Sequence, residues 1–333
     1  MTALHPAQAL YSRGKSFPAL AACEHYAGSE KLIRKALQLQ VNSVHANRPI
    51  FDITADCEDG ASVGNEEPHA QMVANIICDS GNHFDRVGAR IHDIVHPHWR
   101  RDLDIIIGRA GERVAYIVLP KVNDAADVQT QINALNVVCK QRNIQREIPV
   151  HVLIETPGAL HDVWAIAAMP QVESIDFGLM DFVSEHCGAI PASAMQSPGQ
   201  FEHPLIVRAK CEIAAAALGN GIIPAHNVTT ELRDTAVVKN DASRAYLEFG
   251  FLRMWSIHPN QIQPIVEAMQ PDFADVTDAT TILCLGQDAA WGPTQHAGRL
   301  HDRASYRYYW EVLRRAHITG MRLPVMAMQR FFT

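Results

Sequence analysis

Two acidic residues stand at the ends of two apolar, strand-like runs in the middle of the chain. Glu155 closes the run at 149–155, and Asp181 directly follows the run at 174–180. The carboxyl ends of parallel strands open onto the functional face of an α/β fold, so both side chains are predicted to lie on that face. Carboxylate oxygens are preferred ligands of hard divalent cations, and the pair therefore predicts a Mg²⁺ site.

Three further strand-like runs end in, or contain, charged residues that a buried strand would normally avoid. These residues are Glu58, Asp59, Arg90 and Lys121. Burying such groups without partners is costly, so their clustering at one face requires ion pairs, a metal or a substrate. Two interpretations of Arg90 stay open. It forms a structural ion pair with Glu58 or Asp59, or those acids orient its guanidinium toward a substrate carboxylate or carbonyl. Lys121 is either a rim residue or a substrate-binding one.

The elements that would position these residues follow a repeating pattern of strand and helix. The strand-like runs are 17–23, 50–57, 86–91, 114–120, 149–155, 174–180, 221–228 and 252–258. Helical patterns separate several of them, at 30–41, 124–141 and 207–221. Eight largely apolar runs of this kind predict an α/β fold, a (β/α)₈ TIM-type barrel. A doubly wound sheet is disfavoured, because no GxGxxG follows the first run and eight units exceed its usual six.

The character of the chain changes after about residue 270, so two parts are predicted. Residues 1–270 form the barrel with the metal and keto-acid site, and 271–333 form a C-terminal helical extension. The extension is expected to contain a helix, a loop rich in Gly and His, and a second helix with an aromatic run. It is expected to act as a lid or an inter-subunit element.

Composition excludes several classes of function. The formal net charge is −7 and no block of Lys and Arg reverses it, which argues against a nucleic-acid partner. No apolar run approaches the roughly 18 residues of a membrane span. The 7 cysteines are scattered without CxxC spacing, which indicates reduced thiols. We therefore expect a cytoplasmic protein that binds neither membrane nor nucleic acid.

Several stretches occur in an order that resembles a known family. They are DCEDGA, ARIHD, VLPKV, LIET, FGLMDF, ELRD and WSIHPNQI, followed by GRLHD at 298–302. Together they resemble the HpcH/HpaI aldolase and citrate lyase superfamily, in the branch of citrate lyase β subunits and malyl-CoA lyases. The stretches extend from about residue 50 to 305, and their shared order makes the resemblance specific.

The resemblance implies a role for each candidate residue. Glu155 and Asp181 would hold Mg²⁺, with Mn²⁺ as the alternative ion. Arg90 would bind the keto-acid fragment, with the acids Glu58 and Asp59 beside it as further catalytic residues. In the CoA-dependent members an aspartate of the C-terminal extension acts as acid and base, often from a neighbouring subunit, and Asp302 matches that position.

The resemblance also implies an activity and an assembly. The activity is Mg²⁺-dependent carbon–carbon cleavage or condensation of a 3-hydroxyacyl-CoA or related hydroxy acid, giving an α-keto acid or glyoxylate and an acyl-CoA. A homotrimer or homohexamer is usual in this group. His226 and Asn227 stand where the family often has Asp-Gly, so we expect His226 to contact the substrate together with Arg90 and Lys121. The alternatives are a class II pyruvate aldolase that uses no CoA, and a non-catalytic binding or accessory subunit.

Overall fold

The structure is a computed structural model that describes residues 4–11, 17–45 and 48–332. The chain divides into two compact units. One is Phe17–Met269, and the other combines Gln270–Thr333 with the described part of Met1–Ser16. The N-terminal segment therefore groups with the C-terminal part of the chain, whereas the sequence prediction assigned it to the barrel.

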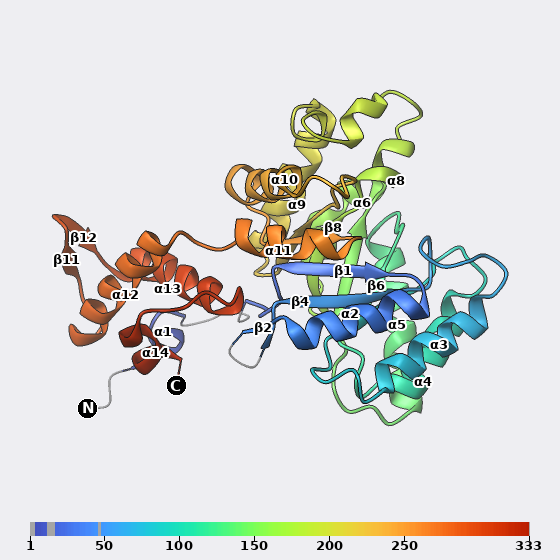
Figure 1. Ribbon diagram of the computed structural model, residues 1–333, viewed down its shortest axis with the longest axis horizontal. Helices are drawn as coiled ribbons and strands as arrows, with labels where there is room; N and C mark the ends of the chain where they lie inside the picture. The colour runs from blue at the N-terminus through green and yellow to red at the C-terminus, as the bar shows by residue number, and fades with distance from the viewer. Residues whose placement is uncertain (1–3, 12–16, 46–47, 333) are drawn as a thin grey trace. The chain divides into compact units, whose positions relative to one another are not determined.

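The larger unit is a closed barrel of parallel strands in the order β1-β10-β9-β8-β7-β6-β5-β4 (Figure 1). This arrangement confirms the predicted (β/α)₈ fold. The strands are β1 (Cys23–Ala27), β4 (Phe51–Asp56), β5 (Val87–Arg90), β6 (Ile117–Leu119), β7 (Val150–Ile154), β8 (Val172–Phe177), β9 (Ile223–His226) and β10 (Arg253–Ser256). A short antiparallel pair, β2 (Val44–His45) and β3 (Arg48–Pro49), precedes β4.

Helices surround the barrel and shield the outer faces of its strands (Figure 1). They are α2 (Glu30–Asn42), α3 (Glu66–Cys78), α4 (Trp99–Ala110), α5 (Ala125–Gln141), α6 (Pro157–His161), α7 (Val163–Ala167), α8 (Leu179–Ser184), α9 (Pro204–Gly219), α10 (Thr235–Phe249) and α11 (Pro259–Ala268). Two 3₁₀ turns, η1 (Ala192–Met195) and η2 (Gly199–Phe201), lie between α8 and α9. The predicted helices at 30–41, 124–141 and 207–221 correspond to α2, α5 and α9.

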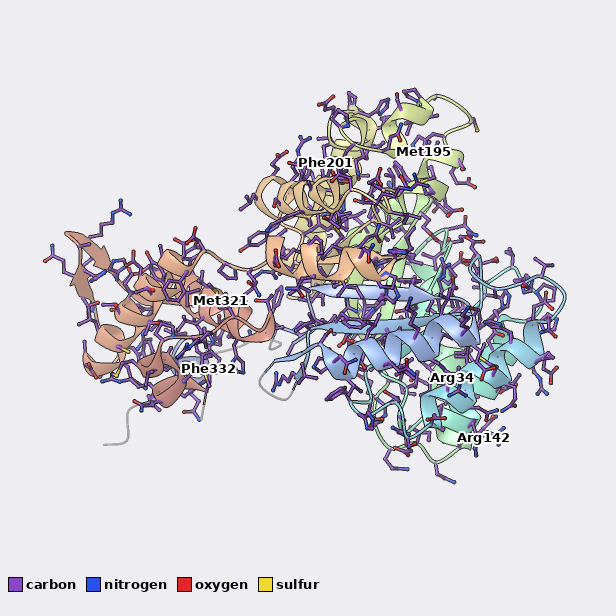
Figure 2. The ribbon with its side chains drawn as sticks, viewed as in Figure 1. Arg34, Arg142, Met195, Phe201, Met321 and Phe332 are labelled. Atoms are coloured by element: carbon purple, nitrogen blue, oxygen red, sulfur yellow. The ribbon has the colours of Figure 1, made fainter. Side chains whose placement is uncertain are left out.

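Helix α2 shows how local sequence sets these elements. The Ser29 side chain caps its first turn by accepting a hydrogen bond from the amide of Leu32 at 3.4 Å. Ile33, Ala36 and Leu37 follow at helical spacing and are buried against the barrel, while Arg34 projects outward (Figure 2). The same division between a buried apolar stripe and an exposed polar one positions the helix on the sheet.

The first strand lies later in the chain than the sequence predicted. The predicted run 17–23 is not a strand, and β1 is Cys23–Ala27 instead. Its residues Glu24 and Tyr26 interrupt the apolar pattern by which the other strands were predicted, yet both are at least nine-tenths buried. They point into the barrel because alternate residues of a strand face the same side.

The barrel interior is consequently polar at one level. Arg253 on β10 pairs with Asp52 on β4, and His151 on β7 lies 3.8 Å from Glu24 on β1. Neither pair comes from neighbouring strands of the sheet, so these side chains must meet inside the barrel. The outward-facing residues of the strands form the main apolar core with the helices.

The smaller unit is helical and has its own apolar core. Its elements are α1 (Pro6–Ala9), α12 (Phe273–Asp288), β11 (Thr294–His296), β12 (Arg299–His301), α13 (Arg303–Ile318) and α14 (Val325–Phe331). The predicted Gly- and His-rich loop contains the β11–β12 hairpin. Trp310 packs within this core, stacked on Phe332, and Met321 borders it (Figure 2). Among the described residues of both units, no helix is long and apolar enough to span a bilayer.

Candidate active site

A cavity of about 260 Å³ opens at the carboxyl ends of the barrel strands. Its lining residues are Tyr26, Asp56, Asp59, Gly60, Arg90, Glu155, Phe177, Gly178, Leu179, Met180, Asp181, Asn227, Val228, Trp255 and Ile257. The structure therefore brings four of the predicted site residues together: Asp59, Arg90, Glu155 and Asp181. Active sites of TIM barrels lie at this end of the barrel.

Arg90, the last residue of β5, is held by two acids from the neighbouring strand β4 and its loop. Its Nε and Nη2 contact the Asp56 carboxylate at 2.7 and 2.5 Å, and its Nη1 lies 3.0 Å from Glu58. Asp56 also accepts from the backbone amides of Glu58 and Gly60, which fixes the loop. A guanidinium carries five N–H groups and Asp56 accepts from two of them, so both Nη1 and Nη2 keep N–H groups for a ligand.

Lys121 joins the ends of three strands through its backbone and its side chain. Its φ of +49° is left-handed, a conformation that costs a non-glycine residue roughly 1 kcal/mol and that clusters at functional sites. Its amide donates to Glu155 Oε2 at 2.8 Å. Its ammonium contacts Glu58 and lies 2.9 Å from Asp59. These contacts raise the pKa of Lys121 despite its partial burial, which lowers it.

Glu155 and Asp181 differ in their surroundings. Glu155 is only 2% exposed, and burial raises its pKa to about 8, with Arg90 acting to lower the pKa and Asp181 to raise it. Asp181, in the first turn of α8, is more than a third exposed, and Lys121 Nζ lies 3.8 Å from its carboxylate. One buried and one accessible carboxylate therefore share a cavity wall.

Gly178 is required by the position of Glu155. A Cβ built on Gly178 would lie 2.1 Å from Glu155 Cγ and 2.3 Å from its Oε1. No side chain fits there unless Glu155 moves, so the glycine at the end of β8 holds the carboxylate in place.

The charged residues at the strand ends carry an excess of negative charge. We call Asp56, Glu58, Asp59, Arg90, Lys121, Glu155 and Asp181 the mouth cluster. Its five carboxylates face two cationic side chains. A divalent cation bound by oxygen ligands would offset this excess, and Glu155 with Asp181 supplies the donor type that Mg²⁺ prefers. The residues present therefore fit the predicted metal.

A second group of buried polar residues lies within the barrel. We call Glu24, Asp52, His151, Asp176 and Arg253 the interior cluster. Ligand atoms of Glu24, His151 and Asp176 lie within 4.8 Å of one another, which is compatible with a metal ion. Two of the three residues already face a positively charged or hydrogen-bonding partner, although Glu24 Oε2 and His151 Nδ1 have no hydrogen bond among the described residues. Arg253 lies 2.9 Å from Glu24, and Asp176 accepts from Trp255 Nε1 at 3.3 Å.

The protonation states of the interior cluster favour an ion-pair network over a metal site. Although burial lowers the pKa of His151, its contacts with Glu173 and Glu24 raise it to about 9. Burial raises the pKa of Asp176 to about 7, assisted by Glu24. When Asp176 carries a proton, a protonated His151 and Arg253 balance the charges of Glu24 and Asp52. All five members are wholly enclosed, so an ion would also lack a route to them.

The structure does not bring His226 into the cavity. Ala225 faces the barrel interior, so His226 points outward. Its ring is fully buried between Phe251 and Phe201, which is labelled in Figure 2. Burial lowers its pKa well below the usual range, and nearby Lys210 lowers it further. Asn227, the next residue, lines the cavity instead.

Asp302 lies in the smaller unit, where it begins helix α13. Its carboxylate accepts hydrogen bonds from the amides of Ala304 at 2.9 Å and Ser305 at 3.4 Å. The Ser305 hydroxyl in turn accepts from the Asp302 amide, which completes a capping box. Within this unit Asp302 also lines a cavity of about 590 Å³ with Arg303 and Arg307.

Sequence reasoning missed three residues of the cavity. Asp56 is the main partner of Arg90, whereas the prediction selected Glu58 and Asp59. Tyr26 and Trp255 stack on each other with ring centroids 4.3 Å apart, and Arg90 lies over the Tyr26 ring. The period-two pattern Asp52, Thr54, Asp56 could have indicated that Asp56 faces inward. Tyr26 gave no such signal, because its strand was misplaced.

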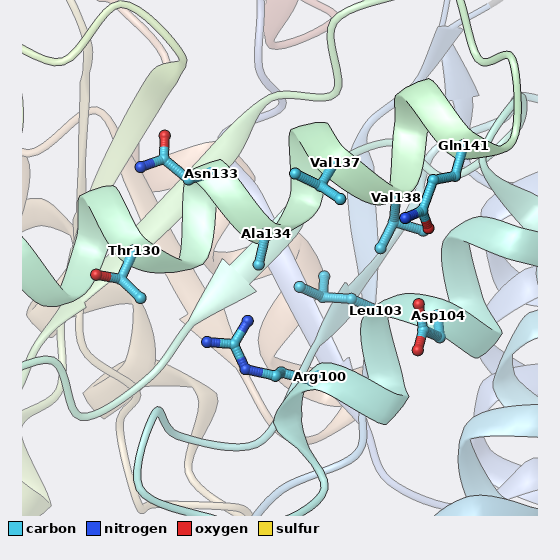
Figure 3. A pocket seen from close by; sticks show the side chains of 9 residues that line it. All are labelled: Arg100, Leu103, Asp104, Thr130, Asn133, Ala134, Val137, Val138 and Gln141. Atoms are coloured by element: carbon cyan, nitrogen blue, oxygen red, sulfur yellow. The ribbon is translucent and has the colours of Figure 1, made fainter.

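A further hollow lies between the outer helices α4 and α5, and it shares no lining residue with the cavity at the strand ends (Figure 3). Arg100 and Asp104 are its charged lining residues, and Val137 and Val138 contribute apolar surface. One Arg and one Asp on helix surfaces form no recognisable catalytic set, so we assign no function to this hollow.

Comparison with known proteins gives one consistent result. The family model described as HpcH/HpaI aldolase/citrate lyase matches residues 53–259. The L-malyl-CoA/beta-methylmalyl-CoA lyase of Cereibacter sphaeroides is 28% identical over 291 residues, covering 80% of this chain and 87% of that protein. The crystal structure of a citrate lyase from Burkholderia xenovorans LB400 is 51% identical, with a TM-score of 0.85, covering 99% of this chain and 100% of that one.

A more distant solved structure shares the fold. It is CitE from Mycobacterium tuberculosis, in complex with magnesium, acetoacetate and coenzyme A. It is 20% identical, with a TM-score of 0.66, over 90% of this chain and 99% of that one. The resemblance drawn from the ordered sequence stretches is thus confirmed.

Proposed function

Because this chain belongs to the HpcH/HpaI aldolase/citrate lyase family, we propose that it is a carbon–carbon lyase acting on a CoA thioester. The substrate would be a 3-hydroxyacyl thioester with a carboxylate on its hydroxyl-bearing carbon. Cleavage would give an α-keto acid and an acyl thioester, and condensation would join them. The observation that carries the proposal is the mouth cluster, in which Arg90, Glu155 and Asp181 line one cavity.

Glu155 and Asp181 would hold Mg²⁺, with Mn²⁺ as the alternative. When bound, the ion would act as a Lewis acid toward the oxygens of an α-keto carboxylate. Glu155 is positioned for this by the Lys121 amide and by the space at Gly178. Its buried carboxylate lacks a cation of its own, since Lys121 directs its ammonium to Glu58 and Asp59.

Arg90 would bind and orient the keto-acid portion of the substrate. Asp56 accepts from two of its N–H groups and fixes the plane of the guanidinium, while Glu58 lies 3.0 Å from Nη1, so that Nη1 and Nη2 keep N–H groups for a ligand. Fixed donors aimed at an oxygen that gains negative charge stabilise the transition state without reorganisation. Glu58 and Asp59 would therefore act through the orientation of Arg90 and Lys121.

Asp302 would move a proton to or from the carbon that becomes nucleophilic in condensation. Its carboxylate also caps α13, so replacement by Ala would remove two functions together. Asn is an equally good N-cap but cannot transfer this proton. Asp302→Asn therefore separates catalysis from folding of the smaller unit.

The test is thioester cleavage by purified protein with Mg²⁺, followed by release of the keto acid. We expect turnover to disappear after chelation and to fall strongly in Asp302→Asn with unchanged thermal stability. An enzyme that cleaves a free hydroxy acid as well as its thioester, regardless of Asp302, would instead be a CoA-independent pyruvate aldolase. Metal-dependent keto-acid binding without turnover of either substrate would indicate an accessory subunit.

A further inference from the structure

The cavity wall is divided into two arcs that follow the order of the strands around the barrel. Strands β4, β5 and β7 and their loops contribute Asp56, Asp59, Arg90 and Glu155, with Asp181 at the border on α8. From β8 through β9 and β10 to β1 the wall is apolar, and we call this stretch the apolar arc. Its main members are Tyr26, Phe177, Met180, Val228, Trp255 and Ile257.

The apolar arc offers no positive charge to a ligand. Arg90, on the other arc, is the one basic side chain among the described residues that line the cavity. Asn227 is the polar member of this side, and its amide nitrogen donates to Gln200 Oε1 and to the Val228 carbonyl, both at 2.9 Å. The indole N–H of Trp255 is directed to Asp176.

Tyr26 does not change this conclusion. Its hydroxyl is enclosed and has no hydrogen-bond partner in the described structure, so it is the ring that faces the cavity. That ring is stacked on Trp255. The hydroxyl lies close enough to Glu24 and Asp176 to feel their charge, and a carboxylate brought to it would be repelled by them.

This division determines what the far end of a keto acid would meet. With its α-keto carboxylate on the charged arc beside Arg90, the substituent on the keto carbon would point toward the apolar arc. A second carboxylate there would lose water without gaining a cation, which is costly. An alkyl or aryl group would instead gain about fourfold in affinity for each methylene buried.

We propose that the keto acid used by this site carries a single carboxylate and an uncharged, apolar substituent, so that dicarboxylic keto acids are poor ligands. The proposal rests on the lyase function proposed above and names its substrate class. Val228 and Ile257 are the positions that would set this preference, because both are at least partly exposed on the apolar arc.

The test is calorimetric titration of the full chain with Mg²⁺ present, using keto acids matched in carbon number. 2-Oxobutyrate is compared with oxaloacetate, and 2-oxovalerate with 2-oxoglutarate, so each pair differs by a methyl group against a carboxylate. We expect the monocarboxylic acid of each pair to bind at least about tenfold more tightly, because burying its one extra methyl group gains about fourfold and the carboxylate in its place would pay a cost of desolvation.

Val228→Arg places a cation on the apolar arc. It should raise the affinity for the dicarboxylic acid of each pair, relative to the monocarboxylic acid, by about tenfold, as expected for pairing a carboxylate with Arg. Val137→Arg makes the same change in the outer hollow shown in Figure 3 and should leave the preference unaltered. Should Val228→Arg fail to fold, Ile257→Lys serves the same purpose, because Ile257 is already 46% exposed.

The outcomes separate the two proposals. If both acids of a pair bind but the dicarboxylic one binds equally or more tightly, the substrate-class proposal is overturned while the keto-acid site stands. If no keto acid binds with Mg²⁺ present, the proposed function and the substrate class fall together. An equal change of preference in Val228→Arg and Val137→Arg would also contradict the assignment to the apolar arc.

Discussion

The barrel contains charge at two levels, and the two levels are organised differently. In the interior cluster, Arg253 lies 2.8 Å from Asp52 and 2.9 Å from Glu24, and His151 supplies a second positive charge. In the mouth cluster, five carboxylates share two cations. Both sets belong to the same barrel, one on the strands and the other at and just beyond their carboxyl ends, and they differ in their balance of charge.

The comparison teaches how to distinguish a structural ion network from a binding site. A buried set of charges whose signs balance does not need a charged ligand, and removing one member should affect folding. An unbalanced set open to solvent is incomplete without a ligand, and its removal should affect function while costing little stability. We interpret the interior cluster as the first kind and the mouth cluster as the second.

The largest effect is expected for Glu155→Gln in the mouth cluster. The change keeps the shape of the side chain but removes a metal ligand, so turnover should fall by about a thousandfold. Stability of the metal-free protein should stay the same or rise, because burial raises the pKa of Glu155 to about 8 and folding at neutral pH must therefore protonate a carboxylate that is charged in the unfolded chain. Steady-state kinetics and urea unfolding measure the two quantities. A variant that keeps its activity but loses stability would show that Glu155 has a structural role and not a catalytic one.

Arg253→Met makes the opposite kind of change in the interior cluster. Glu24 and Asp52 would remain buried without their shared partner, which should lower the free energy of unfolding by about 3–5 kcal/mol. Urea denaturation measures this loss. Surface Arg34, paired with exposed Glu30, is the matched control, and Arg34→Met should leave the free energy of unfolding almost unchanged because solvent screens an exposed ion pair. Similar losses for the two variants would contradict the assigned role.

The pH dependence of stability sharpens the comparison at His151. Its pKa is about 9 in the folded chain and about 6.5 when unfolded, so the folded state binds the extra proton. This proton stabilises the folded state by about 3 kcal/mol. The stabilisation is fully present below about pH 6.5 and is lost as the pH rises through 9. The groups around His151 are Glu24, Glu173 and Asp176, with Tyr116 stacked on the ring.

The measurement is urea unfolding of wild type and His151→Gln between pH 7.5 and 9.5. Asp176, with a pKa of about 7, contributes the same sign but has mostly titrated before this window. Wild type should therefore lose stability more steeply than the variant. Parallel curves would show that His151 is neutral in the folded protein and that the interior cluster is less balanced than we infer.

Gly178→Ala should produce a smaller effect on the mouth cluster. The added methyl group displaces Glu155, and turnover should fall by about 10- to 100-fold through misplacement of a ligand. Gly219→Ala, on the outer helix α9, is a control in which the nearest contact is a side chain at 3.0 Å. Kinetics at varied Mg²⁺ concentration should show that only Gly178→Ala needs more Mg²⁺ to reach half of its maximal rate.

The sequence predicted the fold well because its strand-like runs are largely apolar and regularly spaced, and seven of the eight correspond to barrel strands. It failed at β1, where Glu24 and Tyr26 face a polar interior that no apolar pattern reveals. Glu155, Asp181 and Arg90 were predictable because polar strand ends signal a functional face. The roles of Asp56 and His226 could not be assigned without knowing which alternate residues of β4 and β9 face the barrel interior.

The most direct test of this account is calorimetric titration of Mg²⁺ into wild type, Glu155→Gln and Asp176→Asn. Each variant replaces one carboxylate by its amide, one in the mouth cluster and one in the interior cluster. We predict that Glu155→Gln abolishes Mg²⁺ binding and that Asp176→Asn binds like wild type. Binding that survives in Glu155→Gln but disappears in Asp176→Asn would place the metal among Glu24, His151 and Asp176 and contradict our central claim.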